Sequence, residues 1–393
     1  MPSLEPFAAV RYAEVAGDPS DLVAPPYDVI GPDDRTALEA RSEHNAVRLE
    51  LPSDGHAGAS HRFRAWLEAG ILSRDEVPAY YVYRMTAGDR TTTGVLGALE
   101  LEAPGKGILP HERTTTKDKA DRLGILTETE VNLSPIWGLS ASGGRLARAI
   151  DPSNLQFLAR AVDDADGGVL HDLWRLDDPD RIREVSEAVA AQPVLIADGH
   201  HRFEVANAYR ASPGAAPGAR AILTYVVELA EDELDVHPIH RLLSELPPSL
   251  DLVSALEQWF ALKPSEVDNA GQLMSAMEES GALGLILPDG MWLATPLPST
   301  QEAAEEDLDS CRLDVAIAGL AAQGHGVGLR FQHGADIVAA AIAKGEADAA
   351  VLLRPARIAQ IEATGKGGQR MPPKTTFFWP KPRTGLVFRD LSA

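Results

Sequence analysis

Apolar and amphipathic stretches alternate along residues 59–229, a pattern typical of a mixed sheet with flanking helices. The turn Ala87-Gly88-Asp89 separates two apolar runs and predicts a hairpin. After residue 199, Phe203, Ala206 and Tyr209 recur at helical spacing and form one apolar face. The predicted strands are 79–85, 91–101, 169–176, 193–197 and 220–229, with a short one near 137. The other predicted helices are 59–70 and 179–191. The fold class that follows is α+β.

The proline-rich stretch Leu246-Pro-Pro-Ser-Leu250 predicts a domain boundary. We therefore expect a main domain at 1–246, a smaller α+β unit at 247–365, and a C-terminal segment, 366–393, that returns to the main domain. Rigid prolines, aromatic residues and cations near the end of the chain are unlike a disordered tail. Within the smaller unit the predicted helices are 251–260, 270–279, 308–320 and 335–344, and the predicted strands are 283–287 and 290–296.

Composition narrows the class of protein. The chain has 393 residues, of which 45% are hydrophobic and 24% charged, as in ordinary globular proteins. Its formal net charge of −22 makes nucleic acid an unlikely partner. The single cysteine, Cys311, fits a reducing compartment. The N-terminus has no basic region followed by an apolar run, so no signal peptide is expected, and no apolar stretch is long enough for a membrane span. We expect a cytoplasmic protein; its oligomeric state is not legible.

The stretch Pro193–Glu204 carries the strongest chemical signal. A short apolar strand ends at Asp198-Gly199, and His200, His201 and Arg202 open the helix that follows. Such a strand-to-helix junction is a common place for anion binding, because the first N–H groups of a helix are unpaired. Gly199 would let the backbone approach a phosphate. We expect this strand at the centre of the sheet, opening into a polar pocket. The alternative is a simple turn in which Asp198 caps the helix.

Further polar clusters along the chain are candidate binding residues. One is the charged run after Leu109, in which Thr115 or Thr116 is the predicted helix cap. The cations of this run would oppose the helix dipole unless an anion binds, which favours a phosphate site. The alternative interpretation is a solvated charged face. The pair His237 and His240 could ligate a metal, but no third ligand is legible, so hydrogen bonding is favoured. We expect the surroundings of His111, His201 and Lys374 to converge on one cavity. The remaining candidates are Glu112, Arg113 and Lys117 in the charged run, Tyr27 and Asp28 after two prolines, and Thr375 and Lys381 near the end of the chain.

Four stretches together resemble the DUF1015 family. They are Ala24-Pro-Pro-Tyr-Asp-Val-Ile30; His111-Glu-Arg-Thr114 with Lys117 to Leu123; Ile196-Ala-Asp-Gly-His-His-Arg-Phe203; and Met371-Pro-Pro-Lys-Thr-Thr376 with Trp379-Pro-Lys381. The central Asp-Gly-His-His-Arg segment is also similar to the signature of the ParB/sulfiredoxin superfamily, which includes free-serine kinases. That second resemblance implies a ParB/sulfiredoxin-like core and a segment placed beside a transferred phosphate. Cys311 is far from the motif in sequence, so sulfiredoxin chemistry is not expected.

These observations predict a nucleotide-dependent phosphotransferase that acts on the hydroxyl of a small polar metabolite, serine-like or a hydroxy acid. The expected cofactor is ATP or ADP with Mg²⁺, and no metal ligand is identified. Asp198, His201 and Glu112 are the predicted catalytic residues, and Tyr27 and Asp28 are predicted to bind the substrate. The predicted phosphate ligands are Gly199, His200, Arg202, His111, Arg113, Lys117, Lys374, Thr375 and Lys381. The alternatives are a nucleotide-binding regulatory protein without activity and a nucleotide or phosphate-ester hydrolase.

Overall fold

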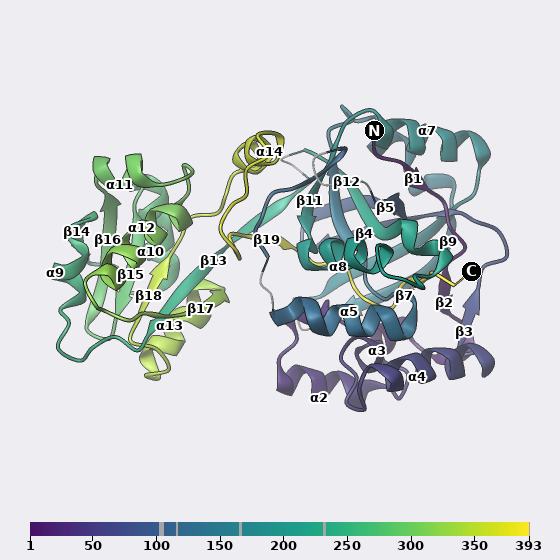
Figure 1. Ribbon diagram of the computed structural model, residues 1–393, viewed down its shortest axis with the longest axis horizontal. Coiled ribbons are helices and arrows are strands. Elements are labelled where there is room, and N and C mark those ends of the chain that lie inside the picture. Colours follow the sequence, from purple (N-terminus) through teal and green to yellow (C-terminus); the bar gives the residue numbers. More distant parts are fainter. Residues whose placement is uncertain (102–105, 115–116, 165–166, 231–232, 393) are drawn as a thin grey trace. The chain divides into compact units, whose positions relative to one another are not determined.

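The structure is a computed structural model that describes residues 1–101, 106–114, 117–164, 167–230 and 233–392 (Figure 1). The predicted helix caps Thr115 and Thr116 lie outside these residues. Contacts between Cα atoms divide the chain into two units. The first unit comprises residues 1–235 and 380–393, and the second comprises residues 236–379. The chain has an α+β fold, as the sequence predicted.

A mixed sheet of nine strands, counted over the described residues, forms the centre of the first unit. Its order is β6-β11-β8-β12-β5-β4-β10-β9, and β1 pairs with β5. The pairs β11–β6 and β12–β8 are parallel, and the other described strand pairs of this sheet are antiparallel. The strands are β1 (Leu4–Glu5), β4 (Tyr80–Ala87), β5 (Arg90–Glu100), β6 (Ile108–Pro110), β8 (Ile136–Ser140), β9 (Gln156–Asp163), β10 (Val169–Leu176), β11 (Val194–Asp198) and β12 (Ala221–Glu228).

The strand that carries the central motif is not at the centre of the sheet, so that prediction was wrong. β11 is second from the edge, between the short strand β6 and β8. Its apolar residues are nevertheless buried, because helices cover the sheet at this edge as well. Full burial of a strand therefore reflects covered faces and does not require a central place in the sheet.

Helices of the first unit build successive layers on the sheet. Figure 1 shows α8 beside α5 and α5 beside α4, and residue contacts confirm both packings. Val205 and Tyr209 of α8 pack with Leu126 of α5 in one apolar cluster. The helices are α1 (Pro19–Leu22), α2 (Pro32–Arg41), α3 (Val47–Glu50), α4 (His56–Glu68), α5 (Lys117–Thr129), α6 (Arg145–Ala149), α7 (Pro179–Ala190) and α8 (His200–Arg210). Two small sheets pair β2 (Val10–Tyr12) with β3 (Leu72–Arg74) and β7 (Val131–Asn132) with β20 (Arg389–Asp390).

The second unit is a sheet with helices on both faces. Its order is β14-β16-β15-β18-β13-β17, and β19 pairs with β13. Alternate side chains face opposite cores: Leu243 packs with α9 and α12, whereas Leu242 packs with α10 and α13. The strands are β13 (Asp235–Ser244), β14 (Phe260–Ser265), β15 (Leu283–Leu287), β16 (Gly290–Pro296), β17 (Gly328–His333), β18 (Ala349–Leu352) and β19 (Thr376–Trp379). The helices are α9 (Leu252–Leu256), α10 (Ala270–Ser280), α11 (Pro298–Ala303), α12 (Asp309–Ala322), α13 (Ala335–Ala343) and α14 (Ile358–Lys366).

The division between the units falls at other positions than the predicted 246 and 365. Strand β13 begins at Asp235 and pairs with β17 and β18, so the chain enters the second unit before the proline-rich stretch. Strand β19 also pairs with β13, which keeps residues up to 379 in the second unit. The predicted helix 251–260 is shorter, because Phe260 starts strand β14.

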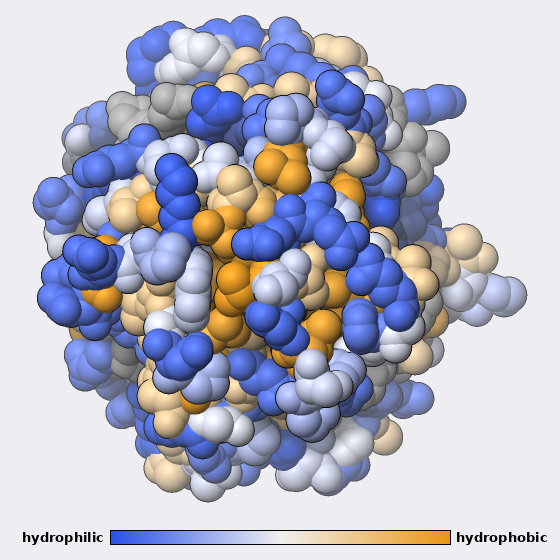
Figure 2. Space-filling model, turned by 90° about the vertical axis from the view of Figure 1, so that its left-hand side faces the viewer, coloured by the Kyte–Doolittle hydropathy of each residue, from blue (hydrophilic) through white to orange (hydrophobic). Residues whose placement is uncertain are grey.

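The face of the molecule shown in Figure 2 carries both apolar and polar residues. In the view of Figure 2, apolar residues gather in the middle of one face and polar residues surround them. No helix among the described residues combines the length and the hydropathy that crossing a membrane requires.

Candidate functional site

The junction between β11 and α8 positions the central motif. Gly199 is the N-cap of α8 and adopts the left-handed conformation, with φ +90° and ψ 27°. A Cβ atom at this position would lie 2.8 Å from Cγ2 of Ile136 and 3.1 Å from Nε of Arg202, so the site requires glycine. Asp198 belongs to the strand and does not cap the helix, which excludes the alternative interpretation of Asp198. Because the N-cap residue is a glycine, it has no side chain to cap the first N–H groups of α8.

A chain of ion pairs runs through this junction. Nη2 of Arg202 donates to Oδ2 of Asp198 at 2.6 Å. Nζ of Lys381 donates to Oδ1 of Asp198 at 2.7 Å and to Oδ2 of Asp28 at 2.8 Å. The four residues come from three distant parts of the sequence, and the fold of the first unit brings them together. Two carboxylates and two cations therefore alternate at the N-terminus of α8.

Lys381 is the most enclosed member of this chain, with 5% of its surface exposed. Burial alone would lower the pKa of its ammonium group. The carboxylates of Asp198 and Asp28 outweigh burial, and the pKa of Lys381 is raised. Lys381 therefore stays protonated at neutral pH and holds the two carboxylates close to one point.

Arg202 is held from two sides. Besides Asp198, its guanidinium donates from Nη1 to the carbonyl oxygen of Pro135. Its Nε atom is buried and makes no hydrogen bond with any described residue. Burial would lower the pKa of Arg202, but the carboxylates of Asp198 and Asp28 raise it. The guanidinium is thus a fixed cation whose donors are only partly used.

Behind Arg202 lies a small cavity of about 50 Å³, which Glu50, Arg122 and Ser134 also line. Oε1 of Glu50 accepts from Ser134 Oγ at 3.2 Å and from Arg122 Nη1 at 3.5 Å. Burial raises the pKa of Glu50, although Arg122 opposes this shift. The volume suits a few water molecules and excludes a nucleotide.

Tyr27 lies next to this group of charges. The guanidinium of Arg122 stands over the Tyr27 ring, 4.3 Å from its centroid. Burial raises the pKa of Tyr27, so its hydroxyl remains protonated and able to donate. Pro26 is extended and Tyr27–Val29 form a short 3-10 helix, which places Tyr27 and Asp28 side by side at the site.

His111 and His200 are buried and bound to the backbone. Nδ1 of His111 lies 2.6 Å from the carbonyl oxygen of Ile196, and the two imidazole rings meet edge to face, with their centroids 4.7 Å apart. Nε2 of His200 accepts from the N–H groups of His111 and Glu112, each at 3.3 Å. His200 is therefore neutral, with its proton on Nδ1. These contacts fasten the segment after β6 to the start of α8.

Two cations on α5, Lys119 and Arg122, have carboxylate partners. Lys119 pairs with Glu204 of α8 at 2.5 Å, and Thr114 donates to the same carboxylate at 2.7 Å. Arg122 pairs with Asp121 and Glu50. The side chain of Lys117 is outside the described set. These partners compensate the charges of Lys119 and Arg122, so these two cations do not need an anion for that purpose.

The structure therefore assembles part of the predicted site. Asp28, Asp198, Arg202 and Lys381 interact directly, with Tyr27 beside them. His201 is half-buried on the first turn of α8, Glu112 is half-buried, and Arg113 is exposed. Lys374 and Thr375 belong to the second unit, where Thr375 donates to the carbonyl oxygen of Pro372 and the carbonyl oxygen of Lys374 accepts from Arg241. Convergence of Lys374 with the central motif thus stays a prediction.

Sequence reasoning missed Glu50 and Ser134. Glu50 ends the four-residue helix α3 in a stretch without a recognisable motif, and Ser134 follows a short strand. The only available signal was a lone acidic residue among apolar neighbours in Val47–Leu51. Such a residue is too common to single out.

The described residues contain no group of three or more His, Cys, Asp or Glu side chains arranged to hold a metal ion. Two carboxylates nonetheless converge on the Lys381 ammonium, so this point favours a cation. Mg²⁺ is commonly bound through one or two carboxylates together with substrate phosphates. Asp28 and Asp198 fit that donor set.

The fold and the site define a two-unit α+β protein with a charged strand-to-helix junction. The chain belongs to the DUF1015 family, described as a protein of unknown function, whose profile matches residues 4–316. A search of curated proteins finds no match. Among solved structures, the chain is similar to a free serine kinase in complex with AMP, with 14% identity, a TM-score of 0.43, and coverage of 76% of this chain and 91% of the other. A conserved hypothetical protein from Pyrococcus furiosus is similar at 13% identity and a TM-score of 0.40, over 74% of this chain and 91% of that one.

Proposed function

We propose that the first unit binds a nucleoside di- or triphosphate with Mg²⁺ and transfers a phosphoryl group to the hydroxyl of a small polar metabolite. The observation that carries this proposal is the chain Asp28–Lys381–Asp198–Arg202 at the N-terminus of α8. Phosphoryl transfer needs fixed cations and N–H donors for the phosphate, and a carboxylate for the attacking hydroxyl. All three kinds of group lie at this junction.

The cations would hold the phosphate. The backbone N–H groups at the start of α8, the guanidinium of Arg202 and the side chain of His201 are the proposed ligands of the transferring group. The ammonium of Lys381 would compensate the charge that develops as the bond to the leaving nucleotide breaks. Binding would require Arg202 and Lys381 to exchange part of their bonding to Asp198 for bonding to phosphate.

Asp198 would orient the acceptor. Its carboxylate would accept the hydrogen bond of the attacking hydroxyl and take up its proton as the new oxygen–phosphorus bond forms. Glu112, which follows His111 beside α8, is the second candidate for this role, and Tyr27 and Asp28 would contact the substrate. Asp28 would hold Mg²⁺ together with the phosphates, and the ion when bound would offset their negative charge.

A binding module without turnover is the second candidate function. Both oxygens of Asp198 accept hydrogen bonds from cations, which leaves fewer of its lone pairs for an acceptor hydroxyl. A regulatory protein that senses nucleotide would need only the cations and the helix N-terminus.

The test is turnover with a library of hydroxyl metabolites, including serine and hydroxy acids, in the presence of Mg²⁺ and either ATP or ADP. Phosphorus NMR would follow the nucleotide and the product. The proposal expects one phosphomonoester for each ADP or AMP released. Release of inorganic phosphate without a phosphorylated metabolite would indicate a hydrolase. Nucleotide binding without consumption would indicate the regulatory module.

A further inference from the structure

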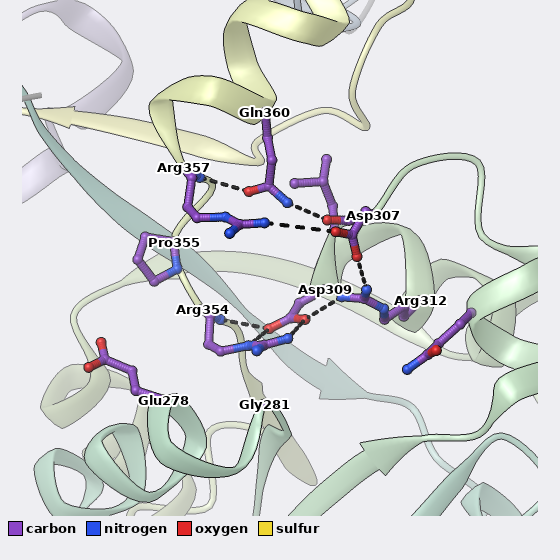
Figure 3. Close-up of a pocket in the computed structure, with 11 residues that line it drawn as sticks. Glu278, Gly281, Asp307, Asp309, Arg312, Arg354, Pro355, Arg357 and Gln360 are labelled. Carbon is purple, nitrogen blue, oxygen red and sulfur yellow. Dashed lines mark hydrogen bonds and ion pairs between the residues drawn. The ribbon is translucent and has the colours of Figure 1, made fainter. Parts of the chain in front are cut away.

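A second cavity, of about 510 Å³, lies entirely within the second unit (Figure 3). Its volume is in the range of small-molecule sites, about 300–1,000 Å³. Residues from α10, α11, α12 and α14 line it, together with the segment that follows β18. Three of these residues are arginines, Arg312, Arg354 and Arg357, and none belongs to the site in the first unit.

One buried carboxylate organises the inner wall of this cavity. Only 3% of the Asp309 side chain is exposed. Arg354 donates to it from Nε at 2.9 Å and from Nη2 at 2.6 Å, and Arg312 donates from Nη1 at 3.0 Å. Figure 3 shows Asp309 between the two guanidinium groups. Arg312 also donates from Nη2 to Asp307, whose side chain is 72% exposed. Two fixed cations therefore share one buried anion, and the second carboxylate lies at the solvent-exposed edge of this cluster.

The rim carries one exposed cation, Arg357, and two exposed carboxylates, Asp307 and Glu278. Asp307 and Arg357 are 3.9 Å apart, with 72% and 74% of their side chains exposed, so water and salt screen their effect. Gln360 forms hydrogen bonds with the backbone of both rim residues. Its Oε1 accepts from the Arg357 N–H at 2.9 Å, and its Nε2 donates to the Asp307 carbonyl oxygen at 2.5 Å. The buried charges therefore decide which ligands the cavity favours.

Two further features favour an anion. Arg312 is 9% exposed, and its Nε atom has no hydrogen-bond partner among the described residues. Helix α12 has 14 residues, and Leu308 at its N-cap offers no side chain to cap the first N–H groups. A buried donor and the N-terminus of a long helix thus meet at one wall of the cavity.

We propose that this cavity is a second ligand site, which binds a small metabolite through a carboxylate or phosphate group. Arg354 and Arg312 would contact the oxyanion, since guanidinium groups match the geometry of both kinds of anion. Arg357 would contribute at the rim. The site is independent of the proposed phosphotransferase chemistry, because it shares no residue with it.

Calorimetric titration of the full chain tests this proposal with two probes, inorganic phosphate and succinate. Arg354→Gln should weaken the binding of at least one probe about 10-fold or more, the usual effect of losing a charge-assisted hydrogen bond. Arg357→Gln should weaken it about threefold, because a rim charge is screened. Arg330→Gln removes the same charge from an exposed residue of β17 in the same unit and should leave the binding of both probes unchanged.

Phosphate also fits the first unit, so the titrations include Arg202→Gln, which should leave this binding unchanged. If Arg354→Gln does not fold, Arg354→Lys replaces it, since it keeps the charge but loses the planar fork. Preference for phosphate or succinate assigns the ligand class, and either supports the proposal. Failure of both probes to bind would overturn it, as would binding that persists in the Arg354 variant or disappears with Arg202→Gln. In those cases the arginines serve only to anchor α12.

Discussion

Nζ of Lys381 lies 2.7 Å from Oδ1 of Asp198, although 183 positions separate the two residues in the chain. The same nitrogen lies 2.8 Å from Oδ2 of Asp28. One buried ammonium group thus joins the beginning, the middle and the end of the first unit at the junction of β11 and α8. This contact is the basis of both the structural and the functional expectations for the site.

Replacing Lys381 by methionine should destabilise the first unit by about 3 kcal/mol. The substitution leaves two carboxylates facing each other without their buried cation, and such a loss is costly. Chemical denaturation would measure the effect. Lys263→Met, which alters an exposed lysine in the second unit, is the matched control and should change stability by no more than about 0.5 kcal/mol.

Adding Asp28→Asn to the Lys381→Met variant should restore part of the lost stability, because only one of the two carboxylates then remains charged. A double variant as unstable as the sum of both single variants would show that the three residues are not energetically coupled.

Asp198→Asn should lower turnover by the ~10²–10⁴ that is usual for a lost catalytic acid or base. Nucleotide affinity should change only slightly, because Arg202 and the N-terminus of α8 remain. Steady-state kinetics with a direct measurement of nucleotide binding separates these effects. Full turnover in this variant would remove Asp198 from the mechanism and leave Glu112 as the candidate.

Gly199→Ala should weaken nucleotide binding about 10-fold or more. The new Cβ atom would press on Ile136 and Arg202, at 2.8 and 3.1 Å, in addition to the strain of a positive φ. Gly214→Ala is the matched control, because its φ of +83° imposes similar strain but no atom lies within 4 Å. Gly214→Ala should lose about 1 kcal/mol of stability, and Gly199→Ala should lose more, because the close contacts add to the strain. Equal nucleotide affinities in the two variants would contradict the proposed close approach at Gly199.

Acid should destabilise the first unit through His171. Burial lowers the pKa of this histidine from 6.5 to about 4, against a weaker opposite effect of Asp172. The unfolded chain therefore binds a proton at a higher pH than the folded one. The contribution of neutral His171 to the free energy of unfolding is complete above pH ~6.5. It is lost as the pH falls toward 4, by about 3 kcal/mol in total.

The matched variant for this effect is His171→Asn, which does not titrate in this range and can still donate a hydrogen bond to Tyr83. Hydrogen exchange of β10 at several pH values, corrected for intrinsic rates, would compare the two proteins. The wild type should lose protection relative to the variant between pH 6.5 and 4. Parallel pH profiles would show that His171 does not contribute.

Sequence patterns predicted the individual elements better than their arrangement. Helix 179–191 and strand 169–176 match α7 and β10 closely, because periodic apolar residues define them locally. The place of β11 near the sheet edge depends on pairing with β6 and β8, which no local pattern encodes. Strand β17 was missed because most of its residues are exposed and carry no period-two pattern.

In the candidate site as well, residues close together in the sequence could be predicted, whereas contacts between distant residues could not. The motif residues Asp198, Gly199 and Arg202 are contiguous, so their chemistry could be seen in the sequence. The ion pairs of Lys381 with Asp28 and Asp198 required the fold. Glu50 and Ser134 could not be recognised from the sequence. Only the packing shows that Glu50 accepts from Ser134 and pairs with the buried Arg122.

The most direct test of the central claim is calorimetric titration of ATP with Mg²⁺ into the wild-type protein and its Arg202→Gln variant. Arg220→Gln, which removes an exposed arginine of the first unit paired with Glu5, is the matched control. The account predicts that the wild type and the control bind one nucleotide with the same affinity. It predicts a loss of about 10-fold or more in Arg202→Gln, because charge-assisted hydrogen bonds to phosphate are lost. A wild-type protein that does not bind ATP or ADP, or an Arg202→Gln variant that binds either as tightly as the wild type, would contradict it.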